Sequence, residues 1–369
     1  MTEPAVIFGG PSAEHDVSIL TGLQAALALS DDGVPVRALY WSKAGDWYEV
    51  DAALEGKHFL EGVPSGAKPL RLVAGKGGGF VATGRALVGR EKALPVSATV
   101  NCCHGGPGED GTLQGMLDLA GVRYTGPTVA GAALGMDKLA FGAVAVGAGL
   151  PSLPRLALTP DAEVPFGGPY IVKPRFGGSS IGVDVVEDAA TARARLAANV
   201  HLRAGAVIEP YRPDSVDLEI AIRSWPSLEL SAIDKPLRSS AASDILGYAD
   251  KYVGGEGMAS APRELPARLP GEIEKQVRDL ALAVVGLTGV RGVARLDFLL
   301  EGDCLYVNEI NTIPGSLAWH LWVDPKIPFA TLLRDMLAEA VERPSTHYTT
   351  AGADGSALRA AGSIGGKLA

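Results

Sequence analysis

Residues 293–311 read VARLDFLLEGDCLYVNEIN, two runs rich in apolar residues on either side of a short turn at Gly302. In a β-strand, successive side chains point to opposite faces, so residues two apart share a face. With a turn symmetric about Gly302, the apolar Leu296 and Phe298 fall on one face of the hairpin. The polar residues expected together on the other face are Arg295, Asp297, Glu309 and Asn311.

The polar face of this hairpin carries two carboxylates and an amide. Carboxylates that converge repel one another unless a cation lies between them, and oxygen-only ligands suit Mg²⁺, particularly beside substrate phosphates. The pattern therefore predicts a magnesium site formed by Asp297, Glu309 and Asn311. The alternative is a strand pair that faces solvent and carries scattered charges.

The composition is that of a globular protein with more than one domain. The 369 residues are 47% hydrophobic and 20% charged, and this length predicts two or three packed domains. A formal charge of −9 argues against nucleic acid as the main partner. No segment is apolar for long enough to span a bilayer, and the first residues lack the basic region of a signal peptide, so we expect a cytoplasmic protein. The cysteines, two of them adjacent at Cys102 and Cys103, predict neither a disulfide framework nor a zinc site.

The N-terminal part alternates apolar runs with glycine turns. Strands are expected at residues 5–8, 36–40 and 98–103. A helix is expected from Ser18, and the residues predicted on its buried side are Ile19, Leu20, Leu23, Ala26 and Leu27. The order of strand, glycine turn and helix predicts an open α/β domain over residues 1–127.

The rest of the chain predicts two further domains and a tail. Residues 128–213 are expected to hold a helix at 129–147 and paired strands at 169–173 and 181–186. Residues 214–345 are expected to hold a strand at 218–223, a polar loop at 239–262, a helix at 269–287 and the final strand pair. Residues 346–369, rich in alanine, glycine and serine, are expected to form a flexible tail.

Two glycine-rich segments are candidate ligand contacts. The loop RFGGSS at 175–180 follows Lys173 and offers backbone N–H groups with little side-chain obstruction, as a flap over phosphates requires. It is not a Walker A loop, because no Gly-Lys-Ser/Thr opens a helix there, and a plain hairpin loop is the alternative. The segment HGGPGEDGTLQG at 104–115 either places backbone against a ligand or a neighbouring loop, or forms a structural turn in which His104 is incidental.

Taken together, these segments resemble the D-alanine:D-alanine ligase family of the ATP-grasp superfamily, in order and spacing, up to about residue 345. The resemblance implies an α/β (α+β) fold of three domains: an N-terminal open α/β substrate domain, a central ATP-grasp domain and a C-terminal ATP-grasp catalytic domain. ATP would lie between the second and third domains, and the protein would be a homodimer. The matching segments are FGGPSAEHDVS at 8–18, the segment at 104–115, YTG at 124–126, MDK at 136–138, VKP at 172–174, GSSIG at 178–182, DKY at 250–252, RLDF at 295–298 and NEINTIPG at 308–315.

The resemblance also implies a set of nucleotide contacts. Lys138 and Lys173 would hold ATP phosphates, and Lys251 would reach the γ-phosphate from a loop. Glu209 matches the acceptor at the adenine edge, and Asp217 matches the ribose ligand. Two Mg²⁺ ions, for which Mn²⁺ is the expected substitute, would be bound by Asp297, Glu309 and Asn311.

The implied reaction has two steps. ATP phosphorylates the carboxylate of a first amino acid, and the amine of a second then attacks the acyl phosphate. Arg295, with the Gly315 N–H, would stabilise the tetrahedral centre. Glu14 would bind the donor's ammonium group, with Ser179 and Tyr252 as its hydrogen-bond partners, although an acid favoured by the helix dipole is the alternative. The substrate contacts implied in total are Glu14, His104, Ser316, His320 and Leu321.

The chain departs from the family pattern at three places. Pro210 replaces the lysine that commonly follows Glu209, and residues 175–177 differ from the usual flap. His320 occupies the position of the serine that anchors the acceptor, unless it is a core histidine packed between indoles. We therefore expect synthesis of D-alanyl-D-alanine for peptidoglycan precursors, or a paralogue that uses another amine acceptor in specialised peptide or antibiotic biosynthesis. A nucleotide-sensing protein without catalysis is the third alternative.

Overall fold

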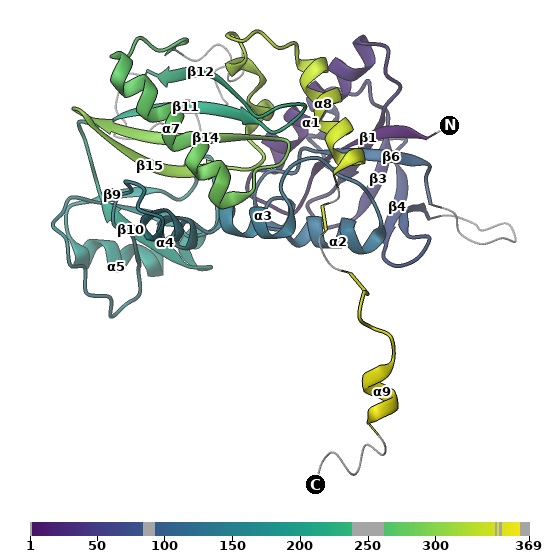
Figure 1. Ribbon diagram of the computed structural model, residues 1–369, viewed down its shortest axis with the longest axis horizontal. Coiled ribbons are helices and arrows are strands. Elements are labelled where there is room, and N and C mark those ends of the chain that lie inside the picture. The colour runs from purple at the N-terminus through teal and green to yellow at the C-terminus, as the bar shows by residue number, and fades with distance from the viewer. Residues whose placement is uncertain (1, 84–92, 238–261, 344, 347–348, 362–369) are drawn as a thin grey trace, which may run out of the picture.

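The computed structural model contains three β-sheets within the residues that it describes, which are 2–83, 93–237, 262–343, 345–346 and 349–361. Each sheet is formed by a separate stretch of the chain, and helices pack against all three (Figure 1). The mixed α/β architecture expected from the sequence is therefore present.

The N-terminal sheet has the strand order β5-β4-β3-β2-β1-β6. β1 pairs in parallel with β2 and β6, and its side chains alternate between two covered faces, with Val6 and Phe8 toward α1 and Ala5 and Ile7 toward α2. The elements are β1 (Glu3–Gly9), α1 (His15–Asp31), β2 (Arg37–Trp41), β3 (Trp47–Val50), η1 (Gly56–Phe59), β4 (Lys68–Val73), β5 (Gly79–Ala82), β6 (Val96–Asn101), η2 (Gly106–Gly108) and α2 (Thr112–Ala120). The three expected strands are confirmed as β1, β2 and β6.

The prediction of which residues of the first helix are buried was partly wrong. Helix α1 begins at His15, three residues before the predicted start, and Leu20 and Leu27 are exposed. Small residues face the sheet instead: a Cβ added to Gly22 would lie 2.4 Å from the Phe8 Cβ. The close approach at Gly22 excludes a larger side chain at that position, while Ile19 and Leu29 are buried elsewhere on the helix.

The single helix expected at 129–147 is two helices, α3 (Val129–Met136) and α4 (Lys138–Gly147). Asp137 separates them with extended backbone, and its carboxylate accepts hydrogen bonds from the N–H groups of Leu139 and Ala140. An aspartate that caps a new helix ends the preceding one. This break places Lys138 at the first position of α4.

The central sheet has the order β7-β10-β8-β9 and the antiparallel β8–β9 pair that the sequence predicted. β9 starts three residues later than expected, because Gly182, inside the expected strand, has a φ of 76° and interrupts the extended backbone. The elements are β7 (Leu156–Ala157), β8 (Tyr170–Pro174), β9 (Asp184–Val186), α5 (Ala189–Ala198), η3 (Val200–Leu202) and β10 (Ala206–Pro210).

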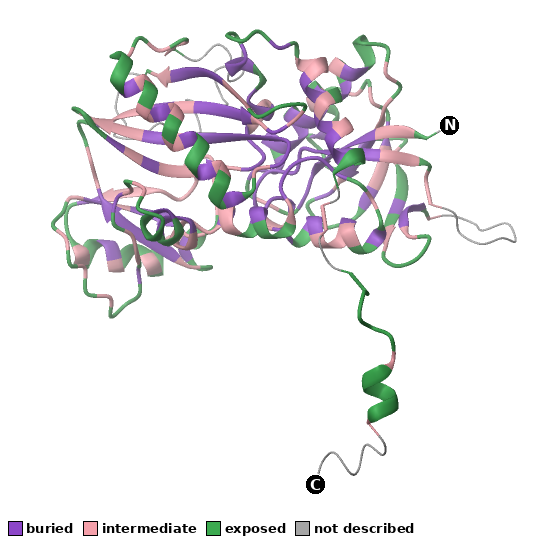
Figure 2. Ribbon diagram, viewed as in Figure 1, coloured by how far each residue is buried: buried purple, intermediate pink, exposed green. Residues whose placement is uncertain are grey.

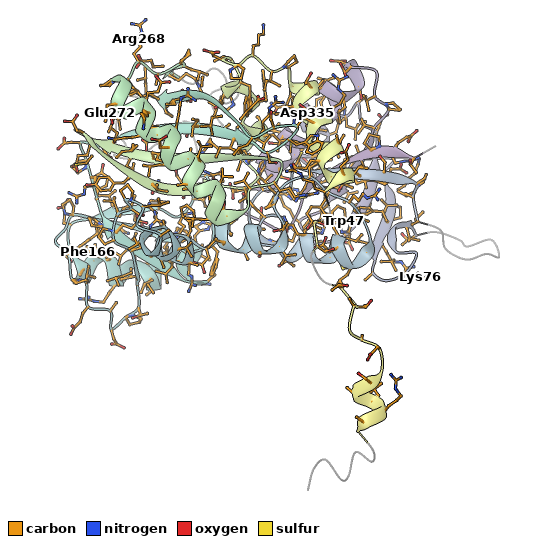
Figure 3. The ribbon with its side chains drawn as sticks, viewed as in Figure 1. Trp47, Lys76, Phe166, Arg268, Glu272 and Asp335 are labelled. Atoms are coloured by element: carbon orange, nitrogen blue, oxygen red, sulfur yellow. The ribbon has the colours of Figure 1, made fainter. Side chains whose placement is uncertain are left out.

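The C-terminal sheet has the order β13-β12-β11-β14-β15, and α7 packs on one of its faces. The side chain of Arg268, just before α7, points outward at the edge of the molecule (Figure 3). The elements are β11 (Val216–Arg223), β12 (Glu229–Pro236), β13 (Arg263–Glu264), α7 (Gly271–Thr288), β14 (Val293–Glu301), β15 (Cys304–Asn311), η5 (Gly315–Leu321) and α8 (Phe329–Glu342).

The β14–β15 hairpin does not have the symmetric turn about Gly302 that the sequence analysis assumed. Glu301 pairs with Cys304, so the turn contains two residues, and this register would put Glu309 on the apolar face. A β-bulge at Asn308 shifts the register, so that Glu309 lies opposite Asp297. The four polar residues thus share a face as predicted, for a different reason.

The largest core joins the two ends of the chain. Helix α8 packs against α1 and β6, and side chains from both ends share one hydrophobic cluster. Buried residues concentrate where the sheets and helices meet, whereas the exposed tail segment with α9 (Ser356–Ala360) projects from the body (Figure 2). Of the helices that the structure describes, none has both the length and the apolar character needed to cross a bilayer.

Candidate active site

The polar face of the β14–β15 hairpin brings together the residues predicted for metal binding. Arg295 lies opposite Asn311, and Asp297 lies opposite Glu309. The Arg295 Nε and Nη2 atoms each donate to one oxygen of Asp297 at 2.7 Å, and the Asn311 amide donates to Asp297 at 3.1 Å. A carboxylate held by a two-pronged arginine contact has a fixed orientation.

Excess negative charge surrounds Asp297. Burial, together with the nearby charges of Glu219 and Glu309, raises the pKa of Asp297 to about 7, although Arg295 opposes the shift. The Lys138 Nζ lies 3.0 Å from Glu309 Oε2. Among the described residues, no three His, Cys, Asp or Glu side chains are close enough to hold a metal by themselves. Two carboxylates and an amide on one face still form the oxygen donor set that Mg²⁺ takes beside phosphates, so the residues fit the ion that the sequence predicted.

A cleft beside this face forms the first of two adjoining pockets, which we call the nucleotide pocket after the ATP contacts that the sequence predicts on its wall. The empty space in it, counted with the open solvent at its mouth, is about 1030 Å³. Residues of β8, β10, β11, β14, β15 and the 175–183 loop line it. The predicted nucleotide and metal residues on its wall are Lys138, Lys173, Glu209, Asp217, Asp297 and Glu309.

Glu209 is buried between two cations rather than presented to the cleft alone. Its Oε2 lies 3.0 Å from Lys173 Nζ, and its Oε1 lies 2.9 Å from Arg155 Nε. Burial opposes ionisation, but the charges of Lys173 and Arg155 hold the pKa of Glu209 below its ordinary value. The carboxylate is therefore committed to an ion cluster, and its predicted contact with the adenine edge stays a prediction. Arg155 was not foreseen, since a single arginine in the apolar run PSLPRLAL gives no local signal.

The 175–180 loop reaches from the nucleotide pocket toward the N-terminal domain. Lys138 Nζ donates to the Gly177 carbonyl at 2.6 Å, and Arg175 forms an ion pair with Asp137 at the base of the loop. At the far end, the Ser179 hydroxyl donates to Glu14. The loop thus contacts both Lys138, which is predicted to hold phosphate, and Glu14, which is predicted to bind the donor.

The second pocket, which we call the amino-acid pocket after the predicted donor contact Glu14, adjoins the first, and its empty space, counted with the open solvent at its mouth, is about 620 Å³. Glu14 enters it from the turn before α1 and is only 8% exposed. Two glycines leave room for this acid: a Cβ on Gly105 would lie 2.4 Å from one carboxylate oxygen, and a Cβ on Gly178 would lie 3.0 Å from both. The residues lining both pockets are Lys138, Gly177, Gly178 and Glu309.

Glu109 is a second buried acid in the amino-acid pocket, and the sequence analysis missed it. Its carboxylate accepts hydrogen bonds from the N–H groups of Gly105 and Ile313 and lies 3.3 Å from the Thr312 hydroxyl. Burial and the charge of Glu14 raise the pKa of Glu109 to about 7. The acid in GEDG was a visible signal, but its partners Thr312 and Ile313 lie 203 and 204 positions away in the sequence.

His104 lines the amino-acid pocket, but both of its ring nitrogens bind protein groups. Because the Ile313 carbonyl only accepts, Nδ1 carries the proton and donates to it at 2.7 Å, while Nε2 accepts from the Thr21 hydroxyl at 2.8 Å. The Thr21 oxygen in turn accepts from the Ser316 N–H. Burial lowers the pKa of His104 to about 4, so the ring is neutral and joins the N-terminal part to the loop after β15.

The segment predicted to contact the acceptor begins with three left-handed residues, Ser316, Leu317 and Ala318, each with φ near 50°. His320 is 7% exposed, and within the described chain neither of its ring nitrogens has a hydrogen-bond partner. Burial, with the charges of Arg263 and Arg295, lowers its pKa to about 3.

The two tryptophans that flank His320 have other ring partners. Trp319 stacks on Phe329 at 5.7 Å, and Trp322 lies under the Arg223 guanidinium. Ser316, His320 and Leu321 do not line the amino-acid pocket that the structure describes, whereas Arg295 and Gly315 do. The contact of Ser316, His320 and Leu321 with an acceptor stays a prediction. Lys251 and Tyr252 lie outside the described residues.

Family models and full-length relatives both match this chain. Residues 3–127 match the family described as the D-ala D-ala ligase N-terminus, and residues 156–337 match the D-ala D-ala ligase C-terminus. A D-alanine–D-alanine ligase of Bradyrhizobium sp. (strain ORS 278) is 30% identical over 92% of this chain and 95% of its own length. One of Mycobacterium sp. (strain KMS) is 31% identical over 93% and 97%, respectively.

Solved structures share the fold. The D-alanine–D-alanine ligase of Helicobacter pylori superposes with a TM-score of 0.72 at 24% identity, covering 94% of this chain and all of that one. The VanG D-Ala:D-Ser ligase of Enterococcus faecalis superposes with a TM-score of 0.75 at 23% identity, covering 92% and 99%. With both family regions matched and full-length relatives at 30% identity, the chain belongs to the D-alanine–D-alanine ligase family and has its ATP-grasp fold.

Proposed function

We propose that this protein is an ATP-dependent ligase that joins two D-alanine molecules through an amide bond for peptidoglycan precursors. The observation that carries the proposal is that the two pockets meet at Lys138, Glu309 and the 177–178 backbone. A carboxylate in the amino-acid pocket can therefore approach the terminal phosphate of a nucleotide in the other pocket. The names of the full-length relatives support the choice of D-alanine.

The residues around this junction have complementary tasks in the proposed reaction. Lys138 and Lys173 hold the phosphates, and Asp217 holds the ribose. Bound magnesium, held by Asp297, Glu309 and Asn311, would neutralise charge on the transferring phosphoryl group. The donor carboxylate oxygen attacks the γ-phosphorus and releases ADP. The acceptor amine then attacks the acyl carbon, and inorganic phosphate leaves with the former carboxylate oxygen.

Different residues of the amino-acid pocket bind the donor and stabilise the tetrahedral centre. Glu14, oriented by Ser179, pairs with the donor ammonium, and the neighbouring charge on Glu109 strengthens that attraction. Arg295 and the Gly315 N–H face the same pocket and stabilise the oxyanion that forms when the amine adds. Arg295 is oriented by Asp297 before substrate arrives, so it needs little reorganisation.

A second candidate function is ligation to a different amine acceptor. It is favoured by the buried His320, whose ring nitrogens lack hydrogen-bond partners among the described residues. A buried polar group without a partner is costly, and an acceptor bearing a matching polar group would satisfy it. The remaining proposals from the sequence are domains at 1–127, 128–213 and 214–345 with a flexible tail at 346–369, a homodimer, and a cytoplasmic location.

The test is a matrix of D- and L-amino acids, taken in pairs with ATP and Mg²⁺, with products identified by mass spectrometry and phosphate release measured in parallel. We expect D-alanyl-D-alanine as the main product, with one phosphate released per dipeptide. A main product from D-alanine and another amine would establish the second candidate instead. If no pair gives an ATP-dependent condensation product, the ligase proposal fails.

A further inference from the structure

Arg155 connects three parts of the nucleotide pocket, although it does not line that pocket. It lies in the segment between α4 and β7, and its side chain is 3% exposed. Its Nη1 donates to the Lys138 carbonyl at 3.0 Å, its Nε pairs with Glu209, and its Nη2 donates to the Asn308 carbonyl and lies 3.3 Å from Asn308 Oδ1. One guanidinium therefore contacts the start of α4, the strand β10 and the strand β15.

The contact with Asn308 falls on the bulge that decides which way β15 faces. Without the bulge, the pairing that starts at Glu301 and Cys304 would continue and would turn Glu309 and Asn311 toward the apolar core. A bulge leaves backbone groups outside the regular ladder. Arg155 supplies a donor for the Asn308 carbonyl, and Lys173 Nζ lies 3.4 Å from the Asn308 side chain.

We propose that Arg155 is a positioning residue for metal–nucleotide binding, because it fixes the Asn308 bulge and so holds Glu309 on the pocket face. This inference rests on the proposed function. The same guanidinium fixes Glu209 and thereby Lys173, so both a metal acid and a phosphate lysine depend on one buried cation. Groups that orient metal ligands from behind commonly matter 10- to 100-fold for metal affinity, to an order of magnitude.

Arginine is needed here because its planar fork can serve three acceptors at once. A lysine would keep the charge beside Glu209 but could not reach Lys138 and Asn308 together. The Arg155 side chain also packs closely against Gly142 in α4: a Cβ added to Gly142 would lie 2.8 Å from Arg155 Cδ and 3.4 Å from two of its nitrogens. Gly142 therefore gives a second way to disturb Arg155 without changing it.

The test measures binding of Mn²⁺ by electron paramagnetic resonance in the presence of a non-hydrolysable ATP analogue and without amino acids. The variants are Arg155→Lys and Gly142→Ala. The matched controls are Arg291→Lys, which changes a buried arginine that donates to backbone carbonyls elsewhere, and Gly147→Ala, which adds a methyl group in the same helix with no atom within 4 Å.

We expect Mn²⁺ affinity to fall about 10-fold in Arg155→Lys and in Gly142→Ala and to stay within about twofold of wild type in both controls. Alanine favours a helix more than glycine does, so Gly142→Ala should not lose affinity through weaker helix formation. If Arg155→Lys does not fold, Gly142→Ala decides. Wild-type affinity in folded Arg155→Lys or in Gly142→Ala would overturn the inference. Because no amino acid is present, wild-type protein that binds metal and nucleotide but condenses no pair would refute the proposed function alone.

Discussion

The two pockets differ in how their charges are balanced. In the nucleotide pocket, acids and bases already pair with one another: Lys173 with Glu209, Lys138 with Glu309, and Arg295 with Asp297 at the border. In the amino-acid pocket, Glu109 is held by N–H donors and lies near a hydroxyl, and Glu14 accepts a hydroxyl hydrogen bond. The first pocket can exchange internal ion pairs for ligand charges, whereas the second contains two neighbouring buried acids, Glu14 and Glu109.

This difference in charge balance predicts which ligands each pocket can bind. A nucleotide with metal brings both signs of charge and can replace the internal ion pairs without leaving a buried charge unmatched. Two neighbouring buried acids instead raise the cost of ionisation, which is seen in the raised pKa of Glu109. An ammonium group would lower that cost. The comparison therefore predicts that changes in the two pockets have different experimental signatures.

The largest expected effect is at the border between the pockets. Arg295→Ala should lower kcat about 1000-fold, since it removes the fixed cation facing the tetrahedral centre, and Arg295→Lys should be a poor substitute because lysine cannot hold Asp297 with two bonds. Steady-state phosphate release with D-alanine measures this loss. Arg268→Ala, at a side chain 94% exposed, is the control. A fall in kcat smaller than tenfold in Arg295→Ala would show that Arg295 does not stabilise the tetrahedral centre.

The next effect is on stability and tests the buried charge of the amino-acid pocket. Burial raises the pKa of Glu109 to about 7, so between pH 4.5 and 7 the folded protein keeps a proton that the unfolded chain has lost. The contribution of this group to the free energy of unfolding therefore falls by up to about 3 kcal/mol as pH rises through that window. Above the window the contribution is constant.

Glu109→Gln removes this titration. The free energy of unfolding of the variant, minus that of wild type, should rise between pH 4.5 and 7 and then level off, as measured by denaturant unfolding at each pH. Other titrating groups cancel in the difference to first order. A difference that does not change with pH would contradict the comparison of the two pockets, because the amino-acid pocket would then hold no carboxylate with a raised pKa.

A third prediction separates the pockets by substrate. Glu14→Gln should raise the KM for the donor amino acid about 100-fold, because an ammonium group would lose its buried charge partner, and should change the KM for ATP little. Asp16→Asn, at an exposed acid in the first turn of α1, is the control. Initial rates with each substrate varied in turn provide the measurement. Equal increases in both KM values would show that the two pockets do not act independently.

The smallest expected effect concerns acceptor choice. His320→Ser should shift preference toward D-alanine about fivefold relative to other amines, a change worth about 1 kcal/mol. Competition between acceptors, followed by mass spectrometry, measures the ratio, with the exposed His201→Ser as control. Burial lowers the pKa of His320 to about 3, so the shift should not vary between pH 6 and 9. An unchanged ratio would leave His320 as core packing.

The sequence predicted the elements and residues whose signals are local. Alternation along residues 293–311 identified the polar face of the hairpin, and the apolar runs identified β1, β2 and β6. Even the bulge left a trace, because the core residues Val307 and Ile310 are three apart instead of two. The assumption of a symmetric turn concealed that signal.

The missed features depend on partners far away in the chain. Glu109 bonds to Ile313 and Arg155 bonds to Asn308, across separations of 204 and 153 residues, and no periodicity links such positions. Hydrogen bonds of this kind become visible only when the fold brings the segments together. The break at Asp137 was missed for a different reason: a capping aspartate inside a continuous alanine-rich run was outweighed by helix propensity.

The bulge also predicts an epistatic relationship within β15. Deleting Asn308 would remove the extra residue and leave a regular ladder in which Glu309 still opposes Asp297. In that shortened background the strand would have no alternative register to suppress, and Arg155→Lys should be milder than in the full-length chain. The two changes together would then cost less than the sum of each alone, so the length of β15 and the hydrogen bonds of Arg155 can compensate one another here.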